Sequence, residues 1–327
     1  MSEGQKSEVR SQKGRRVIEW LVVIVTLSVL AWLTLDLNST DPKRVVVYAA
    51  QDQVYAEPIL REFTRQTGIE VRAVYDSEAV KTVGLANRLL AEPPHPQCDV
   101  FWNNEELRTR QLAAQGLFQE TNGWRTFGFR SRRLVINTNR LFLATAPRSL
   151  KELTNSVWRG KVALAYPLFG TTATHFLALR QQWGEAPWLA WCRALQANEP
   201  LLADGNSVVV NLVGRGEAWV GLTDSDDVSA GQREGWPIAE APLNADLLLI
   251  PNSVGLVRHG PHPVEAQVLA VYLSSAQIIQ QLIQAHALEG PSISAVAVPT
   301  LPVDWPGLLR DLEPATATLK EIFLRSK

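Results

Sequence analysis

The sequence has 327 residues, of which 46% are hydrophobic and 20% are charged, and its formal net charge is -1 at pH 7. This balance excludes an intrinsically disordered chain, which would be poorer in hydrophobic residues and more highly charged. It also argues against a basic surface for nucleic acid, and no nucleic-acid partner is expected. Because compact domains commonly contain about 100–150 residues, a chain of this length predicts two lobes of ordinary size.

The sequence contains two cysteines, Cys98 and Cys192. Each lies in an apolar segment, QCDVFW and LAWCRAL, and a free cysteine in such a setting is most often a small core residue. Two isolated cysteines supply neither a disulfide framework nor a metal–thiolate site.

The N-terminal region predicts a membrane segment. Residues 13–16 read KGRR, and the 19 residues 17–35 are apolar except for Glu19 and a few hydroxyl side chains. A basic flank before such a run indicates insertion with the basic end in the cytoplasm, and the run approaches the roughly 20 residues that cross a bilayer. No small-x-small cleavage site precedes Asp36. We therefore expect a cytoplasmic segment 1–16, a transmembrane anchor rather than a removed signal at 17–35, a tether at 36–43, and an exported remainder.

The first exported part reads as alternating strands and helices. Gly68 and Gly116 each end a helical pattern, as left-handed C-terminal residues commonly do. Near-continuous apolar strands alternating with helices predict a parallel sheet covered on both faces. The expected strands are 44–50, 69–75 and 98–102, and the expected helices are 55–68, 76–92 and 104–115.

A second α/β series follows, and the chain then returns to the first. Segments 128–139 and 246–260 read as extended stretches that join the two series, and two crossing strands would form a hinge. We expect lobe 1 to contain 44–132 and 256–327, including the terminal helices, and lobe 2 to contain 133–255. The elements expected in lobe 2 are strands 161–166, 201–204 and 217–223 and helices 171–184, 187–198, 205–216 and 226–235.

Polar side chains gather where the predicted strands end. In open parallel sheets, ligands bind outside the carboxyl ends of the strands, where helix N-termini also point. Ser, Thr, Asp and Asn are also the preferred N-caps of helices, so such residues could simply cap the following helix. A cap needs only one such residue, however, whereas the segments NNE, TTATH and TDSDD each supply several. The candidate ligand-binding residues at these positions are Gln51, Asp52, Glu78, Asn103, Asn104, Glu105, Thr171, Thr172, Thr174, Asn206, Ser207, Asp224, Asp226 and Asp227.

Two further residues at these positions have a less certain role. Most of the 11 tryptophans are expected to pack in the core, whereas Trp102 ends the third strand and is placed to reach a ligand. His175 lies within TTATHFLAL and is as well suited to lining its helix as to binding a solute. The charge run RSRR at 130–133 is expected to be a solvated face.

Several segments resemble a known family: residues 45–92, CDVFWNNE at 98–105, GFRSRRLVINT at 128–138, 153–175 and 204–227. Together they are similar to the extracellular solute-binding proteins of ABC importers, and in particular to the ferric-iron-binding group with the periplasmic-binding-protein type II fold. The segments FGTTATH and GLTDSDD are the most specific parts, and the resemblance extends over residues 44–290.

The resemblance implies a two-lobed α/β fold that closes on one solute and presents it to a membrane permease without catalysing a reaction. It implies a monomer on the periplasmic or extracellular side of the membrane, with an ABC permease as its partner. Closure of such a hinge is driven only by the difference in solute affinity between the open and closed states. The predicted fold class is therefore a type II binding protein with a hinge of two crossing strands, preceded by a transmembrane helix.

The solute is less closely defined by the resemblance. Ferric members hold iron with phenolate oxygens, often from two adjacent tyrosines just past the strand that corresponds to 217–223, with further ligands after the first two strands. Here Asp226 and Asp227 take the tyrosine positions, Asp52 lies after the first strand, and Glu78 lies after the second. Carboxylates are hard donors, so these four are candidate ligands for Fe(III) or another hard cation. Alternatively, they bind a small organic solute such as an amine or a phosphonate.

Arg130 matches an arginine that some ferric members use to hold a synergistic anion such as carbonate. With Thr171 and Thr172 at a helix N-terminus, it forms a candidate anion site. The alternative is an arginine that braces the hinge.

Two other classes of function have some support in the sequence. Ser207, His175 and Asp224 are residue types of a hydrolytic triad, but GNSVV lacks the G-x-S-x-G turn of a nucleophile elbow, and no enzyme is predicted. A membrane-anchored ligand-sensing domain of the same fold is the second alternative, since an uncleaved anchor suits both.

Overall fold

The computed structural model describes residues 43–76 and 81–324. The predicted membrane segment at 17–35 and the candidate ligand Glu78 lie outside these residues. The chain divides into two units, and the second, Arg44–Lys327, contains all the elements described below. Within the described residues, no single helix has the length and apolar character needed to span a bilayer, and one bent pair, Pro263–Leu273 with Ala276–Gln284, meets that test by length and composition alone.

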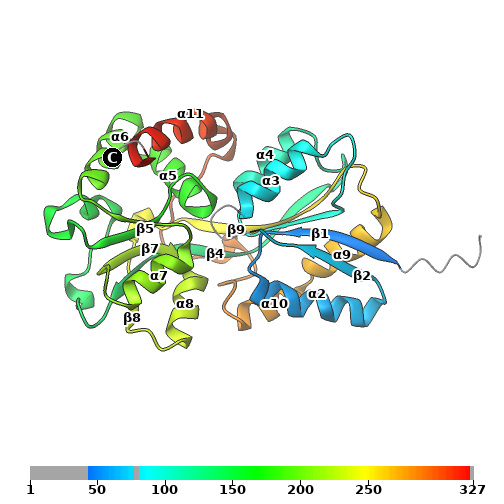
Figure 1. The fold of residues 1–327 in the computed structure, drawn as a ribbon, viewed down its shortest axis with the longest axis horizontal. Helices are drawn as coiled ribbons and strands as arrows, with labels where there is room; N and C mark the ends of the chain where they lie inside the picture. Colours follow the sequence, from blue (N-terminus) through cyan, green and yellow to red (C-terminus); the bar gives the residue numbers. More distant parts are fainter. Residues whose placement is uncertain (1–42, 77–80, 325–327) are drawn as a thin grey trace, which may run out of the picture. The chain divides into compact units, whose positions relative to one another are not determined.

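Lobe 1 begins with three parallel strands and three helices (Figure 1). β1 (Arg44–Ala49) lies between β2 (Glu70–Val74) and β3 (Val100–Asn103), with both pairs parallel. The helices are α2 (Gln53–Thr67), α3 (Lys81–Ala91) and α4 (Glu106–Ala114). Gly68 ends α2 with a φ of 72°, as predicted. The order β2-β1-β3 confirms the expected parallel sheet.

Two long strands connect the lobes, as predicted. β4 (Trp124–Asn137) and β9 (Leu249–Leu256) pair antiparallel from Trp124 opposite Gly255 to Ser131 opposite Leu249. The register shifts between Phe127 and Phe129, and Gly128 between them has a φ of 56°. A side chain at Gly128 would also meet Leu288 at 2.5 Å, so the bend in β4 requires glycine for both conformation and space.

Lobe 2 is a second α/β unit built on the far half of β4. Its sheet has the order β4-β7-β5-β6, and β8 pairs with the other edge of β4. Its strands are β5 (Val162–Ala165), β6 (Leu201–Ala203), β7 (Val220–Asp224) and β8 (Ile238–Ala241). Its α-helices are α5 (Gly170–Trp183), α6 (Glu185–Ala197), α7 (Asn206–Gly214) and α8 (Ser225–Arg233), and its 3-10 turns are Leu143–Thr145, Leu150–Thr154, Ser156–Trp158 and Asn244–Asp246.

The C-terminal helices do not all return to lobe 1. α9 (Pro263–Leu273) and α10 (Ala276–Gln284) contribute Leu269 and Leu282 to the lobe 1 core, as expected. After a 3-10 turn at Ile293–Ala295, α11 (Trp305–Leu324) instead packs against α5 and α6 of lobe 2 and also touches α4 of lobe 1. Leu312 and Phe323 belong to the same core cluster as Phe176. The assignment of all of 256–327 to lobe 1 is therefore corrected for α11.

Each sheet has an apolar core on both faces. In lobe 1, one face carries Trp102 with residues of α2, α9 and α10, and the other carries Phe101 with residues of α3 and α4. In lobe 2, one face packs against α5, α6 and α11, and the other against α7 and α8. Burial of both faces explains why the strands read as continuous apolar runs, and it leaves the strand ends to present polar groups.

Candidate functional site

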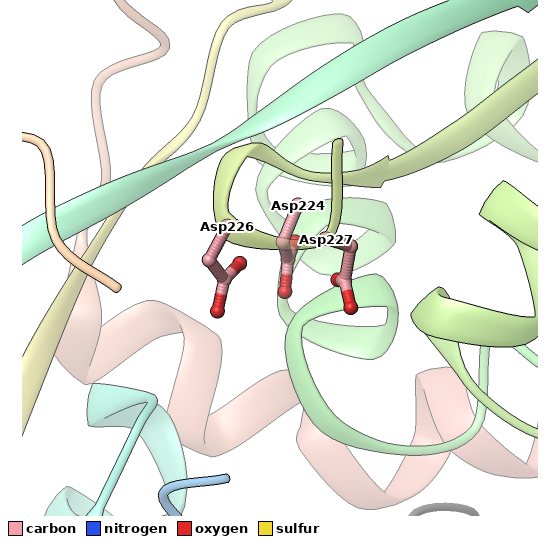
Figure 2. Close-up of side chains that lie close together, drawn as sticks. All are labelled: Asp224, Asp226 and Asp227. Carbon is pink, nitrogen blue, oxygen red and sulfur yellow. The ribbon is translucent and has the colours of Figure 1, made fainter. Parts of the chain in front are cut away.

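Three aspartates converge where β7 meets α8. Asp224 ends β7, and Asp226 and Asp227 lie in the first turn of α8. One carboxylate oxygen from each lies within 4.8 Å of the others, and Figure 2 shows the three side chains projecting from one turn in the same direction. Backbone N–H groups in a first helical turn lack intrahelical partners, and the helix dipole favours negative charge there. We call Asp224, Asp226 and Asp227 the acidic trio.

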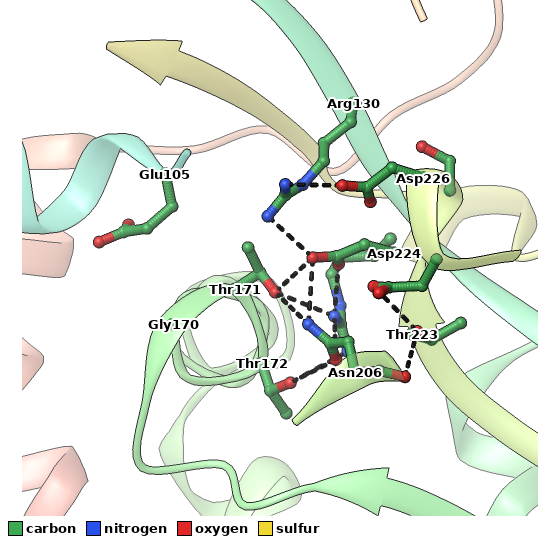
Figure 3. Close-up of polar contacts among 12 residues, drawn as sticks. Glu105, Arg130, Gly170, Thr171, Thr172, Asn206, Thr223, Asp224 and Asp226 are labelled. Atoms are coloured by element: carbon green, nitrogen blue, oxygen red, sulfur yellow. Dashed lines mark hydrogen bonds and ion pairs between the residues drawn. The ribbon is translucent and has the colours of Figure 1, made fainter. Parts of the chain in front are cut away.

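Arg132 holds Asp224 in place. The two residues lie opposite each other in the β4–β7 pairing, and Arg132 Nη1 lies 2.5 Å from Asp224 Oδ1. Both side chains are buried, with exposed fractions of 0% and 1%. Thr171 donates to Asp224 Oδ2 at 2.8 Å and Asn206 donates to the same oxygen at 3.1 Å, so the Asp224 carboxylate is fully committed within lobe 2 (Figure 3).

Arg130 bridges two members of the acidic trio. Its Nη2 lies 3.0 Å from Asp224 Oδ2, and its Nη1 donates to Asp226 Oδ2 at 2.9 Å (Figure 3). The hydroxyls of Thr171 and Thr172 instead accept from Arg132, at 3.1 and 3.2 Å. The side chain that bonds to these threonines is therefore Arg132, two residues further along the same face of β4.

The charges in this cluster shift the protonation of its members. Burial would raise the pKa of Asp224, but the Arg132 and Arg130 guanidinium groups outweigh it and hold that pKa below its usual range. Burial and the negative charges of Asp226, Asp224 and Asp52 raise the pKa of Asp227 well above its usual range. Arg130 and Arg132 thus favour the ionised form of Asp224, whereas burial and the neighbouring carboxylates favour the protonated form of Asp227.

Lobe 1 contributes Asp52 to the same region. Asp52 precedes the first residue of α2, and its charge acts on Asp227 and on Arg130. The phenol of Tyr55, one turn into α2, accepts a hydrogen bond of 3.0 Å from Arg233 at the end of α8. Burial and the charge of Asp226 raise the pKa of Tyr55. The N-terminal end of α2 thus contacts α8 and acts electrostatically on the acidic trio.

A second contact joins the lobes. Glu105 caps α4 by accepting from the backbone N–H groups of Leu107 and Arg108, at 2.7 and 2.9 Å. Thr174 of α5 donates to the same carboxylate at 3.3 Å. Burial raises the pKa of Glu105. Glu105 is therefore a helix cap that also bonds to lobe 2.

Four other candidate ligand-binding residues lie at the ends of strands or the starts of helices, and two of them form hydrogen bonds with neighbouring side chains. Gln51 is buried and accepts from the Asn252 amide at 2.8 Å, and Asn103 donates to the Thr109 hydroxyl at 3.1 Å. Asn104 is buried just beyond β3, and Ser207 is half-buried in the first turn of α7.

His175 does not belong to the site. Its Nε2 lies 2.8 Å from the carbonyl oxygen of Asp246, so this nitrogen carries the proton, and the ring is fully buried. Burial and the charge of Arg132 lower its pKa to about 3.

Sequence reasoning missed Arg132 because it assigned RSRR to a solvated face. Arg130 and Arg132 are instead buried on one side of a crossing strand, with the i, i+2 spacing of a strand face. That spacing, within a segment predicted to cross between the lobes, was the signal that could have identified them. Tyr55 and Arg233 were missed because each lies a full helical turn or more from a strand end.

The family model of bacterial extracellular solute-binding proteins matches residues 44–286. The chain is 30% identical over 196 residues to an Fe(3+)-binding periplasmic protein of Serratia marcescens, and 26% identical over 191 residues to the major ferric iron-binding protein of Neisseria meningitidis. These alignments cover 54% and 53% of the chain, respectively, and 56% of each relative, so they span about half the length of these proteins.

The fold is also similar to that of iron-bound HitA from Pseudomonas aeruginosa, with a TM-score of 0.76 at 18% identity over 86% of this chain and 99% of that structure. This confirms the two-lobed binding-protein fold. Because the family model extends over most of the sequence and the structure contains both lobes with their two crossing strands, the chain belongs to the bacterial extracellular solute-binding proteins.

Proposed function

We propose that this protein captures a positively charged solute between its lobes, on the outer side of the cytoplasmic membrane, and delivers it to the permease of an ABC importer. Fe(III) or another hard cation is the first candidate solute. A small organic amine is the alternative. The observation that carries the proposal is the convergence of the three carboxylates of the acidic trio, on which the charge of Asp52 in lobe 1 also acts.

The balance of charge favours a cation. Asp52 and the three carboxylates of the acidic trio act on one another, and Arg130 and Arg132 contact Asp224 and Asp226. Burial, and then the negative charges of Asp226, Asp224 and Asp52, raise the pKa of Asp227, and a bound cation would favour the ionised form of this carboxyl. A phosphonate is disfavoured, because both terminal nitrogens of Arg130 already contact carboxylates.

The donor atoms suit a hard cation. Asp224 is committed to Arg132, Thr171 and Asn206, so a bound cation would be held mainly by Asp226, Asp227 and Asp52. These residues come from α8 of lobe 2 and the start of α2 of lobe 1. The relatives from Serratia marcescens and Neisseria meningitidis are named for Fe(3+) or ferric iron binding, which supports the same class of solute.

Contacts between the lobes support capture by closure. The bonds from Thr174 to Glu105 and from Arg233 to Tyr55 both join lobe 2 to lobe 1. A solute that contacts Asp52 and the acidic trio would stabilise the arrangement in which these bonds form.

The proposal is tested with the full-length chain, purified in detergent. Metal analysis of protein taken from its native membrane, with calorimetric titration of Fe(III) plus carbonate and of amines, identifies the solute. The variant Asp226→Asn with Asp227→Asn should lose binding at least about tenfold. The matched control Asp304→Asn with Asp311→Asn, which removes two carboxylates near α11, should bind like the natural protein. Equal affinity in all three proteins would refute the proposal.

A further inference from the structure

Three buried side chains, at the carboxyl ends of β1 and β3 and on β9, carry polar atoms without a partner in the described residues. These atoms are the Nε2 amide nitrogen of Gln51, the Nε1 indole nitrogen of Trp102 and the Oδ1 amide oxygen of Asn252. All three side chains are essentially inaccessible, with exposed fractions of 1%, 0% and 0%. A buried polar group without a partner costs free energy, so several in one place require an explanation.

The strand register puts the three side chains on one face of the lobe 1 sheet. Trp102 lies opposite Val254 in the β3–β9 pairing, so Asn252, two residues along β9, shares its face. Ala49 pairs with Trp102 across β1 and β3, and Gln51 follows two residues later. The hydrogen bond of 2.8 Å between Gln51 and Asn252 agrees with this placement.

This position is next to the charged site. Gln51 and Trp102 lie at the carboxyl ends of β1 and β3, the edge at which ligands of such sheets bind. Asp52 follows Gln51 directly, and its charge raises the pKa of Asp227 in lobe 2. Asn252 lies on β9, one of the two strands that connect the lobes.

The unpartnered atoms define the chemistry of a complementary group. Gln51 Nε2 and Trp102 Nε1 are donors, and Asn252 Oδ1 is an acceptor. The oxygen and nitrogen of each side-chain amide could be assigned the other way round. If both Gln51 and Asn252 were exchanged, their mutual hydrogen bond would remain, and one amide donor and one amide acceptor would again be without a partner. A hydroxyl group accepts from donors and donates to an acceptor, so it satisfies either arrangement, whereas a bare metal ion satisfies neither donor.

We propose that Gln51, Trp102 and Asn252 form a neutral subsite that binds an oxygen-bearing, hydrogen-bonding group attached to the positively charged solute. The inference rests on the proposed function and narrows it. The solute is then a cation with an organic part, either an amine that bears a hydroxyl group or a metal ion held by an oxygen-rich organic chelator. An ordered water molecule satisfying the same atoms is the competing explanation.

Two pairs of probes separate these explanations. The first pair is 3-amino-1-propanol and butylamine, which have the same charge and similar size and differ by a hydroxyl group. The second pair is Fe(III) with citrate and Fe(III) with carbonate. In one or both pairs, the full-length chain should bind the first member at least about tenfold more tightly than the second. A difference of this size is expected because the second member leaves the buried donors without a partner.

The variant Trp102→Phe removes the indole N–H and keeps an aromatic ring. We expect it to reduce that preference about fivefold to tenfold, the size of one lost hydrogen bond. Trp188→Phe is the matched control, because Trp188 is also buried with an unpartnered Nε1 but lies in α6 of lobe 2. It should keep the full preference.

Each outcome has a defined meaning. Equal affinity for both members of each pair, or an unchanged preference in Trp102→Phe, overturns the subsite and leaves an ordered water as the explanation. If Fe(III) with carbonate still binds through Asp226 and Asp227 in that case, the proposed function stands without the subsite. If no probe binds and no solute accompanies the protein from its native membrane, both the subsite and the cationic solute are refuted.

Discussion

Arg132 and Asp224 form a fully buried ion pair across the β4–β7 register, with Nη1 and Oδ1 2.5 Å apart. The pair orders the end of β7 from which α8 and the rest of the acidic trio begin. Removing one partner leaves an uncompensated buried charge, whereas the same change at an exposed pair has little effect.

We therefore expect Arg132→Met to lower the free energy of unfolding by about 3–5 kcal/mol. Denaturant unfolding measures this change. Arg159→Met is the control, because Arg159 and Glu199 form a pair that is more than half exposed, and the loss of stability there should be much smaller than in Arg132→Met. Similar losses in the two variants would show that Asp224 finds another partner.

Asp227→Asn should have opposite effects on stability and on binding. The charges of Asp226, Asp224 and Asp52 disfavour an ionised Asp227, so its removal should stabilise the solute-free protein, by roughly 1 kcal/mol. The same change should weaken cation binding about tenfold or more. Thermal unfolding without solute and calorimetric titration with it measure the two effects.

Asp226→Asn provides the contrast. Asp226 pairs with Arg130 in a buried setting, so its replacement should destabilise the protein while also weakening binding. A stabilised Asp226→Asn, or a destabilised Asp227→Asn, would contradict the electrostatic account of the acidic trio.

Thr174→Val should weaken closure of the lobes. The change removes the hydroxyl that donates to Glu105 across the interlobe gap, and one such hydrogen bond contributes about 1 kcal/mol, or roughly a fivefold loss of solute affinity. Thr64→Val is the control, since its hydroxyl bonds to the carbonyl of Leu60 within α2. If both variants bind equally well, the contact between Glu105 and Thr174 does not contribute to closure.

His175 should make the protein sensitive to acid. Its pKa is lowered to about 3 in the folded state, mainly by burial, whereas the unfolded chain has a value near about 6.5. The unfolded state therefore binds more protons below about pH 6.5, and stability is lost as the pH falls from about 6.5 toward about 3, by up to about 5 kcal/mol. Unfolding measured across this range should show a shallower loss in His175→Gln than in the exposed control His95→Gln.

Much of the fold follows from local patterns in the sequence. Apolar strands followed by glycine-terminated helices predicted the parallel sheet of lobe 1, and the extended segments 128–139 and 246–260 predicted the crossing strands β4 and β9. The position of α11 was not predictable in this way. Its apolar stripe shows that it is covered on one side, but Leu312 and Phe323 could pack on either lobe, and only the packed structure places them in lobe 2.

The sequence was sufficient to select the candidate site residues that directly follow the ends of strands. Asp52, Asp224, Asp226 and Asp227 were selected because polar residues at those ends gather at one edge of a sheet, and their charges act on one another in the structure. Arg132 was not selected, because its pairing with Asp224 depends on a register between strands separated by 92 residues. A local charge run gives no information about such a register.

The central claim is that the acidic trio and Asp52 bind the positive centre of the solute. A crystal structure of the full-length chain with the solute that accompanies it from its native cells tests this claim most directly. We predict density for a positive centre within bonding distance of carboxylate oxygens of Asp226 and Asp227, with Asp52 facing it from lobe 1. A solute bound elsewhere, with the acidic trio held only by Arg130 and Arg132, would contradict the account.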